Sequence, residues 1–159
     1  MGKEHRYKLN IIWTGNKGFG TESYRAYDRS HTISSPGKTD IAASADPAFL
    51  GDNTKYNPEE FLLAALSTCH MLWFLHLCAD KGVIVDAYSD EPTGLMLEAN
   101  TGGGQFKEVI LNPKVVVADL SMLSILDELH DLAHKKCFIA NSVNFPVSHI
   151  GNYSAREKK

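Results

Sequence analysis

The sequence predicts a mixed α+β fold. Three observations support this prediction: residues 57–79 read as one long apolar helix, residues 120–134 carry leucines at helical spacing, and short runs rich in β-branched and aromatic residues flank both. Because strands, helix, strands, helix and strand follow one another, we expect sheet material packed around a central helix pair. The length of 159 residues suits a single domain covering residues 1–159.

The N-terminal part is expected to be extended. Residues 7–13 alternate enough for a strand, residues 15–20 form a glycine-rich turn, and residues 22–28 and 31–34 read as further extended pieces. The sequence S-P-G-K at residues 35–38 indicates another turn. A polar loop then leads to the long helix.

The long helix has clear start and stop signals. Asn57 is a good N-cap, Pro58 suits the first helical position, and two glutamates follow where the helix dipole favours them. Gly82 supplies the stop. Residues 61–79 contain no charged side chain other than two histidines that could protonate, so the helix has no solvent face and belongs in a core.

A membrane span is the competing interpretation of residues 61–79, because their length is close to the ~20 residues that cross a bilayer. Two histidines, a serine, a threonine and two cysteines interrupt the segment, and nothing basic flanks its N-terminal side. We therefore expect a core helix and no membrane partner.

The second half should alternate strands with one amphipathic helix. Residues 83–89, 95–99 and 106–117 read as strands, and three glycines between the last two mark a hairpin tip. They do not form a phosphate-binding loop, because no Gly-Lys-Ser/Thr follows and the next element is a strand. Residues 120–134 form the helix, and residues 143–150 close the fold as a strand.

Composition indicates an ordinary soluble globular protein, with 43% hydrophobic and 22% charged residues. The formal charge of −3 argues against a nucleic-acid partner. The N-terminus lacks the apolar stretch of a signal peptide, so we expect a cytoplasmic protein. In that reducing compartment, three cysteines favour thiols that cycle over a structural disulfide framework.

Two cysteines lie in central elements. Cys69 is in the middle of the long helix, and Cys137 follows the last turn of the second helix. Free cysteine usually packs as a small hydrophobe, so Cys69 alone decides little. The second central thiol raises the case for chemistry. Cys78 lies half a helical turn away from Cys69 in azimuth, and the sequence leaves its role open.

The motif N-P-E-E-F-L-L-A-A-L-S-T-C places Cys69 ten positions after Glu59, and Cys137 follows 68 positions later in H-K-K-C-x-x-x-N. Together with W-T-G-N-x-G-x-G-T-x-S-Y-x-x-Y-x-R at residues 13–29, this resembles the OsmC/Ohr family of osmotically induced and organic-hydroperoxide-resistance proteins. The N-terminal motif is closer to the general OsmC-like branch than to Ohr. The resemblance implies antiparallel sheets wrapped around long central helices in an intertwined homodimer, with active sites at the subunit interface.

The resemblance also implies a thiol-dependent peroxidase that reduces organic hydroperoxides in oxidative stress defence. Cys69 would attack the O–O bond and become a sulfenic acid, and Cys137 would condense with it to a disulfide. A dithiol reductant, for the Ohr branch a lipoylated protein, would reset the pair. No cofactor or metal is expected, because Cys69 and His76 lie about 10.5 Å apart along the helix axis and no CxxC or HExxH occurs.

A reactive thiol needs a cation beside it, because an unperturbed cysteine with a pKa of ~8.5 is mostly protonated at neutral pH. In the family an arginine contacts the thiol and a glutamate orients it, and Glu59 matches that glutamate. About 15 Å of helix separates Glu59 from Cys69, so a guanidinium must bridge them or the glutamate must come from another subunit. Arg29 is the first candidate and Arg25 the second, and the Ohr branch has its arginine roughly at Lys17.

Apolar residues on the helix face of Cys69 would favour an organic hydroperoxide over hydrogen peroxide, although plain packing explains them equally well. They are Leu62, Leu66, Leu72 and Trp73. Two other functions stay open. One is a thiol hydrolase or acyltransferase that uses Cys69 with one of the seven histidines, and the other is a non-enzymatic dimer that binds an apolar ligand.

Overall fold

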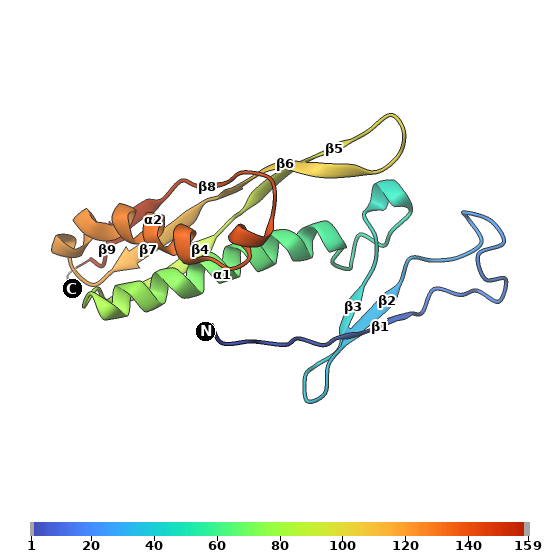
Figure 1. Ribbon diagram of the computed structural model, residues 1–159, viewed down its shortest axis with the longest axis horizontal. Helices are drawn as coiled ribbons and strands as arrows, with labels where there is room; N and C mark the ends of the chain where they lie inside the picture. The colour runs from blue at the N-terminus through green and yellow to red at the C-terminus, as the bar shows by residue number, and fades with distance from the viewer. Residues whose placement is uncertain (1, 158–159) are drawn as a thin grey trace. The chain divides into compact units, whose positions relative to one another are not determined.

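The computed structural model describes residues 2–157 and confirms the α+β class (Figure 1). By its internal contacts the chain forms two compact units, Met1–Phe61 and Leu62–Lys159. Both hydrophobic clusters found among the described residues lie in the second unit. The single domain of residues 1–159 stays a prediction.

The first unit contains a three-stranded antiparallel sheet. Its strands, in order, are β1 (Asn10–Trp13), β2 (His31–Ser34) and β3 (Ile41–Ala43). The predicted strand at 31–34 is confirmed, and the one predicted at 7–13 keeps only its second half. The turn at 35–38 is also confirmed, with Gly37 at φ 75°. A short 3₁₀ helix, η1 (Pro47–Phe49), interrupts the loop that leads to the first long helix.

The extended piece predicted at residues 22–28 is wrong, because this segment forms successive turns. The guanidinium of Arg29 donates to the carbonyls of Tyr24 and Tyr27, at 2.6 Å each. It also lies over both tyrosine rings, 4.2 and 4.3 Å from their centroids. The Arg29 side chain thus donates hydrogen bonds to backbone carbonyls that would otherwise accept from a neighbouring strand. The aromatic composition of the segment does not reveal this competition.

Helix α1 (Pro58–Asp80) confirms the predicted long helix and its end signals. The side chain of Asn57 accepts from the N–H of Glu60 at 2.8 Å, and the Glu60 carboxylate accepts from the N–H of Asn57 at 3.0 Å. This reciprocal pair is a capping box. At the other end Gly82 has φ 71°, and the next N–H donates to the carbonyl of Cys78 at 2.8 Å, as in a Schellman motif.

Within residues 2–157, α1 is the one helix that length and composition would allow to cross a membrane. The core helix of a soluble protein passes the same test. In the second unit, Leu66, Phe74 and Leu77 of α1 are buried in the two hydrophobic clusters. Another side of the helix is open, where Leu72 is 62% exposed. One chain therefore buries part of this apolar helix and leaves part of it uncovered.

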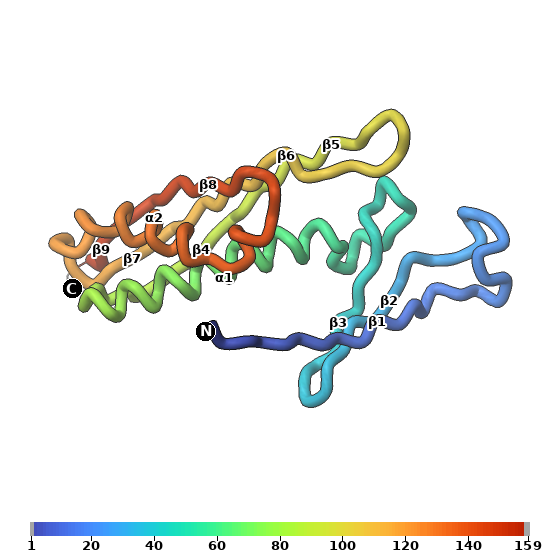
Figure 2. The backbone as a smooth tube through the Cα atoms, in the orientation of Figure 1, coloured from blue at the N-terminus to red at the C-terminus, as the bar shows by residue number. Residues whose placement is uncertain are grey.

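Two three-stranded sheets belong to the second unit. One has the order β4 (Val85–Asp90), β7 (Pro113–Val117), β9 (Asn152–Ala155), and the other β5 (Thr93–Glu98), β6 (Gly104–Leu111), β8 (Val147–His149). The antiparallel pairs fit the prediction, but β8 and β9 join as parallel edge strands, so both sheets are mixed. Since β4 leads into β5, β6 into β7 and β8 into β9, the sheets continue one another across a bend (Figure 2).

The single strand predicted at residues 106–117 is wrong, because the chain bends at Asn112. The N–H of Asn112 donates to one oxygen of Asp90 at 2.7 Å, and the other oxygen accepts from the hydroxyl of Ser67 at 2.5 Å. Asp90 therefore ties the bend to α1. The run of β-branched residues cannot show that the backbone N–H of one of its members donates to a carboxylate distant in the sequence instead of to a neighbouring strand.

The other predictions for the second half are confirmed in part. The strands predicted at 83–89 and 95–99 are present as β4 and β5, and the glycine-rich tip joins β5 to β6. The helix predicted at 120–134 begins as a 3₁₀ helix, η2 (Leu120–Ile125), and continues as α2 (Leu126–Lys136). The strand predicted at 143–150 shrinks to β8 after η3 (Ala140–Ser142), and the pattern does not predict β9.

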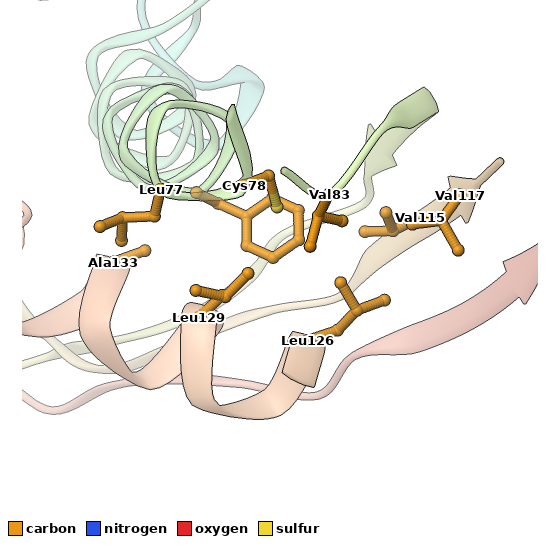
Figure 3. Packing of buried hydrophobic residues seen from close by; sticks show 9 residues of the cluster. Leu77, Cys78, Val83, Val115, Val117, Leu126, Leu129 and Ala133 are labelled. Atoms are coloured by element: carbon orange, nitrogen blue, oxygen red, sulfur yellow. The ribbon is translucent and has the colours of Figure 1, made fainter. Parts of the chain in front are cut away.

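The main core lies where α1, α2 and β7 meet. Figure 3 shows side chains of the three elements pointing toward one another, among them Leu77 and Cys78 of α1, Leu129 and Ala133 of α2, and Val117 of β7. Cys78 is 1% exposed, and burial raises the pKa of its thiol to about 11. Cys78, whose role the sequence leaves open, is therefore a core residue whose thiol stays protonated near neutral pH.

Candidate active site

Cys69 is half-buried on α1 and lines an apolar groove of about 430 Å³ in the second unit. The groove is formed by Cys69, Leu72, Trp73, His76 and Phe138. Leu72 and Trp73 thus lie where the sequence predicts them. Leu62 and Leu66 instead pack in the cluster around Val109 and Leu111, which makes them core residues.

The structure brings Cys137 to Cys69. Cys137 directly follows α2, is 1% exposed, and its thiol interacts with that of Cys69. Its sulfur also accepts from the N–H of Ala140 at 3.4 Å. Burial first, and the hydrogen bond to Cys69 second, raise the pKa of Cys137 to about 11. The Cys69 thiol therefore faces the groove, and the Cys137 thiol lies behind it, protonated and shielded from solvent.

Aromatic rings form the groove around the indole of Trp73. The rings of His76 and Phe138 both meet it edge-on, with centroids 5.8 Å away. The ammonium of Lys136 lies 5.4 Å from the indole centroid. The sequence reasoning missed Phe138, which is 69% exposed, although its place directly after Cys137 is a signal that could have found it.

Glu59 lies in the first turn of α1, ten residues before Cys69. Within residues 2–157, the Oε2 atom of Glu59 is buried and accepts no hydrogen bond. A buried carboxylate oxygen without a partner is costly, so this glutamate is suited to receive a cation.

The three predicted cations differ in what they already bind. Lys17 pairs with Asp28 at 2.6 Å, and Arg29 is held by its own turn as described above. Arg25 is exposed, and the described part of the chain offers its guanidinium no hydrogen bond or ion pair. Of the two arginines, Arg25 is therefore the one whose guanidinium is free for another chain.

A metal centre was not expected from the sequence. In the part of the chain that the structure describes, no group of three or more histidine, cysteine, aspartate or glutamate side chains could hold a metal ion. The groove itself presents the thiol of Cys69 between largely apolar walls.

Comparison with solved structures gives strong matches across almost the whole chain. An OsmC-like protein of unknown function from Vibrio cholerae is 33% identical, with a TM-score of 0.82, and the match covers 93% of this chain and 99% of that one. An organic hydroperoxide resistance protein from Elizabethkingia anophelis is 16% identical with a TM-score of 0.66, covering 97% and 100%. One from Bacillus subtilis is 18% identical with a TM-score of 0.56, covering 92% and 98%.

At such low identity, the two hydroperoxide resistance proteins show a shared fold. Comparison with curated protein sequences gives no match. A family model described as OsmC-like protein matches residues 51–150, which include α1, Cys69 and Cys137. This chain belongs to the OsmC-like protein family.

Proposed function

We propose that the protein is a thiol-dependent peroxidase that reduces organic hydroperoxides to alcohols in oxidative stress defence. The observation that carries the proposal is the contact between Cys69, which faces an apolar groove, and Cys137, which is buried behind it. Membership of the OsmC-like family supports it, as do fold neighbours named for hydroperoxide resistance.

The chemistry needs the two thiols in sequence. The Cys69 thiolate attacks one peroxide oxygen, the O–O bond breaks, and the alkoxide takes a proton and leaves as the alcohol. The sulfenic acid on Cys69 then condenses with the thiol of Cys137, releasing water and forming a disulfide. A dithiol reductant, for which a lipoylated protein is our candidate, returns both cysteines to thiols in a reducing compartment such as the cytoplasm.

A cation beside Cys69 completes the proposal. We place it on an arginine of a second copy of the chain, with Glu59 to orient the guanidinium. Arg29 remains a candidate, but its contacts to Tyr24 and Tyr27 make Arg25 the freer donor. The uncovered apolar side of α1 supports the homodimer, because a second chain would remove that surface from water.

One assay separates this function from its two alternatives. The protein is incubated with cumene hydroperoxide, or with hydrogen peroxide, in the presence of a dithiol, and peroxide loss is followed. We expect turnover with a preference for cumene hydroperoxide. Cleavage of a p-nitrophenyl ester without peroxide turnover would point to a thiol hydrolase. If the protein shows neither activity, the remaining alternative is a non-enzymatic dimer that binds an apolar ligand.

Phe138 should set the preference for bulky peroxides. Phe138→Ala removes the ring that meets Trp73, so we expect a roughly tenfold lower kcat/KM for cumene hydroperoxide, in line with the loss of one apolar contact surface. The rate with hydrogen peroxide should change little, since that substrate does not fill the groove. Phe138→Leu serves as the matched control and should recover part of the loss. An equal fall for both peroxides would contradict this role.

The subunit arrangement can be tested by complementation. We expect sedimentation equilibrium to give twice the 17.6 kDa chain mass. Refolding a Cys69→Ser chain together with an Arg25→Ala chain should restore about a quarter of the wild-type activity, because half the dimers are mixed and each keeps one intact site. The same mixture made with Arg29→Ala shows which arginine acts. An active monomer, or no recovery in either mixture, would rule out a site shared between chains.

A further inference from the structure

A pair of buried histidines joins the two helices that carry the cysteines. His70 on α1 and His130 on α2 are 1% and 0% exposed. Nε2 of His70 and Nδ1 of His130 lie 2.8 Å apart and share a hydrogen bond. The planes of the two rings are nearly parallel, inclined by 8°, and their centroids lie 5.1 Å apart. Their outer nitrogens, Nδ1 of His70 and Nε2 of His130, are buried without a partner in the described residues.

This pair sits beside the proposed redox centre in the chain. His70 is the residue after Cys69 on α1, and Cys137 comes directly after the last turn of α2, seven residues beyond His130. The hydrogen bond between the imidazoles is therefore a polar link between the helix of one thiol and the helix that leads to the other. The remaining α1–α2 contacts described above are apolar.

The groups around the pair are a mixture of histidines, tyrosines and carboxylates. From α2 come His134, Asp127 and Asp131, from β8 His149, from β9 Tyr153 and from β4 Tyr88. The carboxylates are already engaged, because Asp131 lies 3.5 Å from His149, and Asp127 accepts from the hydroxyl of Tyr153 at 2.8 Å. On the remaining side, the ring of Phe74 stacks on His130 at 3.8 Å. Among residues 2–157, no carboxylate contacts His70 or His130 directly to balance a charge.

Both histidines are consequently held neutral. Burial, with a smaller contribution from neighbouring histidines, lowers the pKa of His70 to about 4 and that of His130 to about 3. An exposed histidine has a pKa near 6.5, so an opened state binds more protons than the closed one between pH ~6.5 and pH ~4. The closed arrangement is therefore fully favoured above pH ~6.5 and loses stability as the pH falls through this window.

We propose that His70 and His130 are positioning residues for the resolving step. Their hydrogen bond links α2 to α1 and holds Cys137 against Cys69. At acid pH this hydrogen bond breaks and Cys137 is released. The consequence for disulfide formation rests on the proposed function, whereas the acid release of Cys137 does not. Each histidine that gains a proton on opening makes the opening equilibrium about tenfold more favourable per pH unit. Two histidines together would give up to about a hundredfold per unit.

The release can be measured without any peroxide. In a Cys69→Ser background, which prevents exchange between the thiols, Cys137 is labelled with 4,4′-dithiodipyridine from pH 7 to pH 4 and quantified by mass spectrometry. The labelling rate of denatured protein at the same pH, divided by the rate of the folded protein, gives a protection factor. We expect this factor to fall steeply between pH 6.5 and pH 4.

The matched variant keeps the hydrogen bond and removes the titration. Gln at position 70 places its amide near the site of Nε2, and Asn at position 130 places its amide near the site of Nδ1, so His70→Gln with His130→Asn should hold the protection factor nearly constant over the same range. His5→Gln, which changes an exposed histidine of the first unit, should keep the wild-type profile. A flat profile in the parent protein, or an unchanged steep profile in the double variant, would overturn the proposal.

Two further readouts keep the test decisive. If the double variant does not fold, NMR titration of the parent protein decides: a His70 or His130 ring that protonates near pH 6.5 in the intact fold would overturn the inference. With one equivalent of cumene hydroperoxide, the disulfide yield of the wild type should be lower at pH 5 than at pH 7. If no peroxide is consumed at any pH, the proposed function fails, while the labelling experiment still judges the histidine pair.

Discussion

Replacing Cys69 with serine is expected to abolish peroxide turnover while the protein keeps its fold. A hydroxyl of similar size cannot ionise near neutral pH, so the nucleophile is lost. The rate with cumene hydroperoxide should fall at least about a thousandfold, as when other enzymes lose their nucleophile. Because Cys69 is only half-buried and faces the groove, stability should change by no more than about 1 kcal/mol. Peroxide consumption and thermal unfolding of both proteins provide the measurement.

Cys78 provides the control for this variant. It lies on the same helix but is buried in the core against α2, away from the groove. Cys78→Ala should therefore keep turnover per folded molecule and lower stability by about 1–2 kcal/mol through the lost packing. Full activity in the Cys69→Ser protein, or loss of activity in the Cys78→Ala protein alone, would show that Cys69 is not the reactive thiol.

Replacing Cys137 with serine should give the second large effect, and it should differ in kind. The first oxidation of Cys69 needs no second thiol, so a single turnover should still release one alcohol. The sulfenic acid then has no intramolecular partner, and excess peroxide should convert it to the sulfinic acid. Steady-state turnover with a dithiol should consequently decline with each cycle as enzyme is lost. Mass spectrometry of Cys69 after successive peroxide additions measures the accumulation.

An unchanged steady state in the Cys137→Ser protein would show that the reductant attacks the sulfenic acid directly. A disulfide between Cys69 and Cys78 would name a different partner. The structure disfavours that pairing, because Cys78 packs toward α2 and β7 while Cys69 opens onto the groove. The interaction between the thiols of Cys137 and Cys69 favours the proposed pair.

The sequence is most informative where a local signal coincides with a local structure. Asn57 and Gly82 bound α1 as predicted, since their side chain and backbone conformation act on the neighbouring helix end alone. The predictions fail where a distant group decides the outcome. Asp90 takes the backbone donor of Asn112 and ends β6, and Arg29 takes the carbonyls that would extend the segment at residues 22–28.

The candidate site follows the same division. The motif around Cys69 and the position of Cys137 predict a thiol pair, and the structure places the two in contact. The sequence reasoning missed Phe138, although its place directly after Cys137 was a usable signal. It also missed the His70–His130 pair, because two histidines 60 residues apart form no local pattern. Only the fold shows that the first lines the groove and that the others meet inside the core.

The most direct test of the central claim is a stoichiometric reaction of the reduced wild-type protein with one equivalent of cumene hydroperoxide. The account predicts one cumyl alcohol per chain and a protein lighter by two hydrogens. Peptide mapping should then find one disulfide, between Cys69 and Cys137. Alcohol formed with both cysteines still reduced, or peroxide left unconsumed, would contradict the assignment of these cysteines as a peroxide-reducing pair.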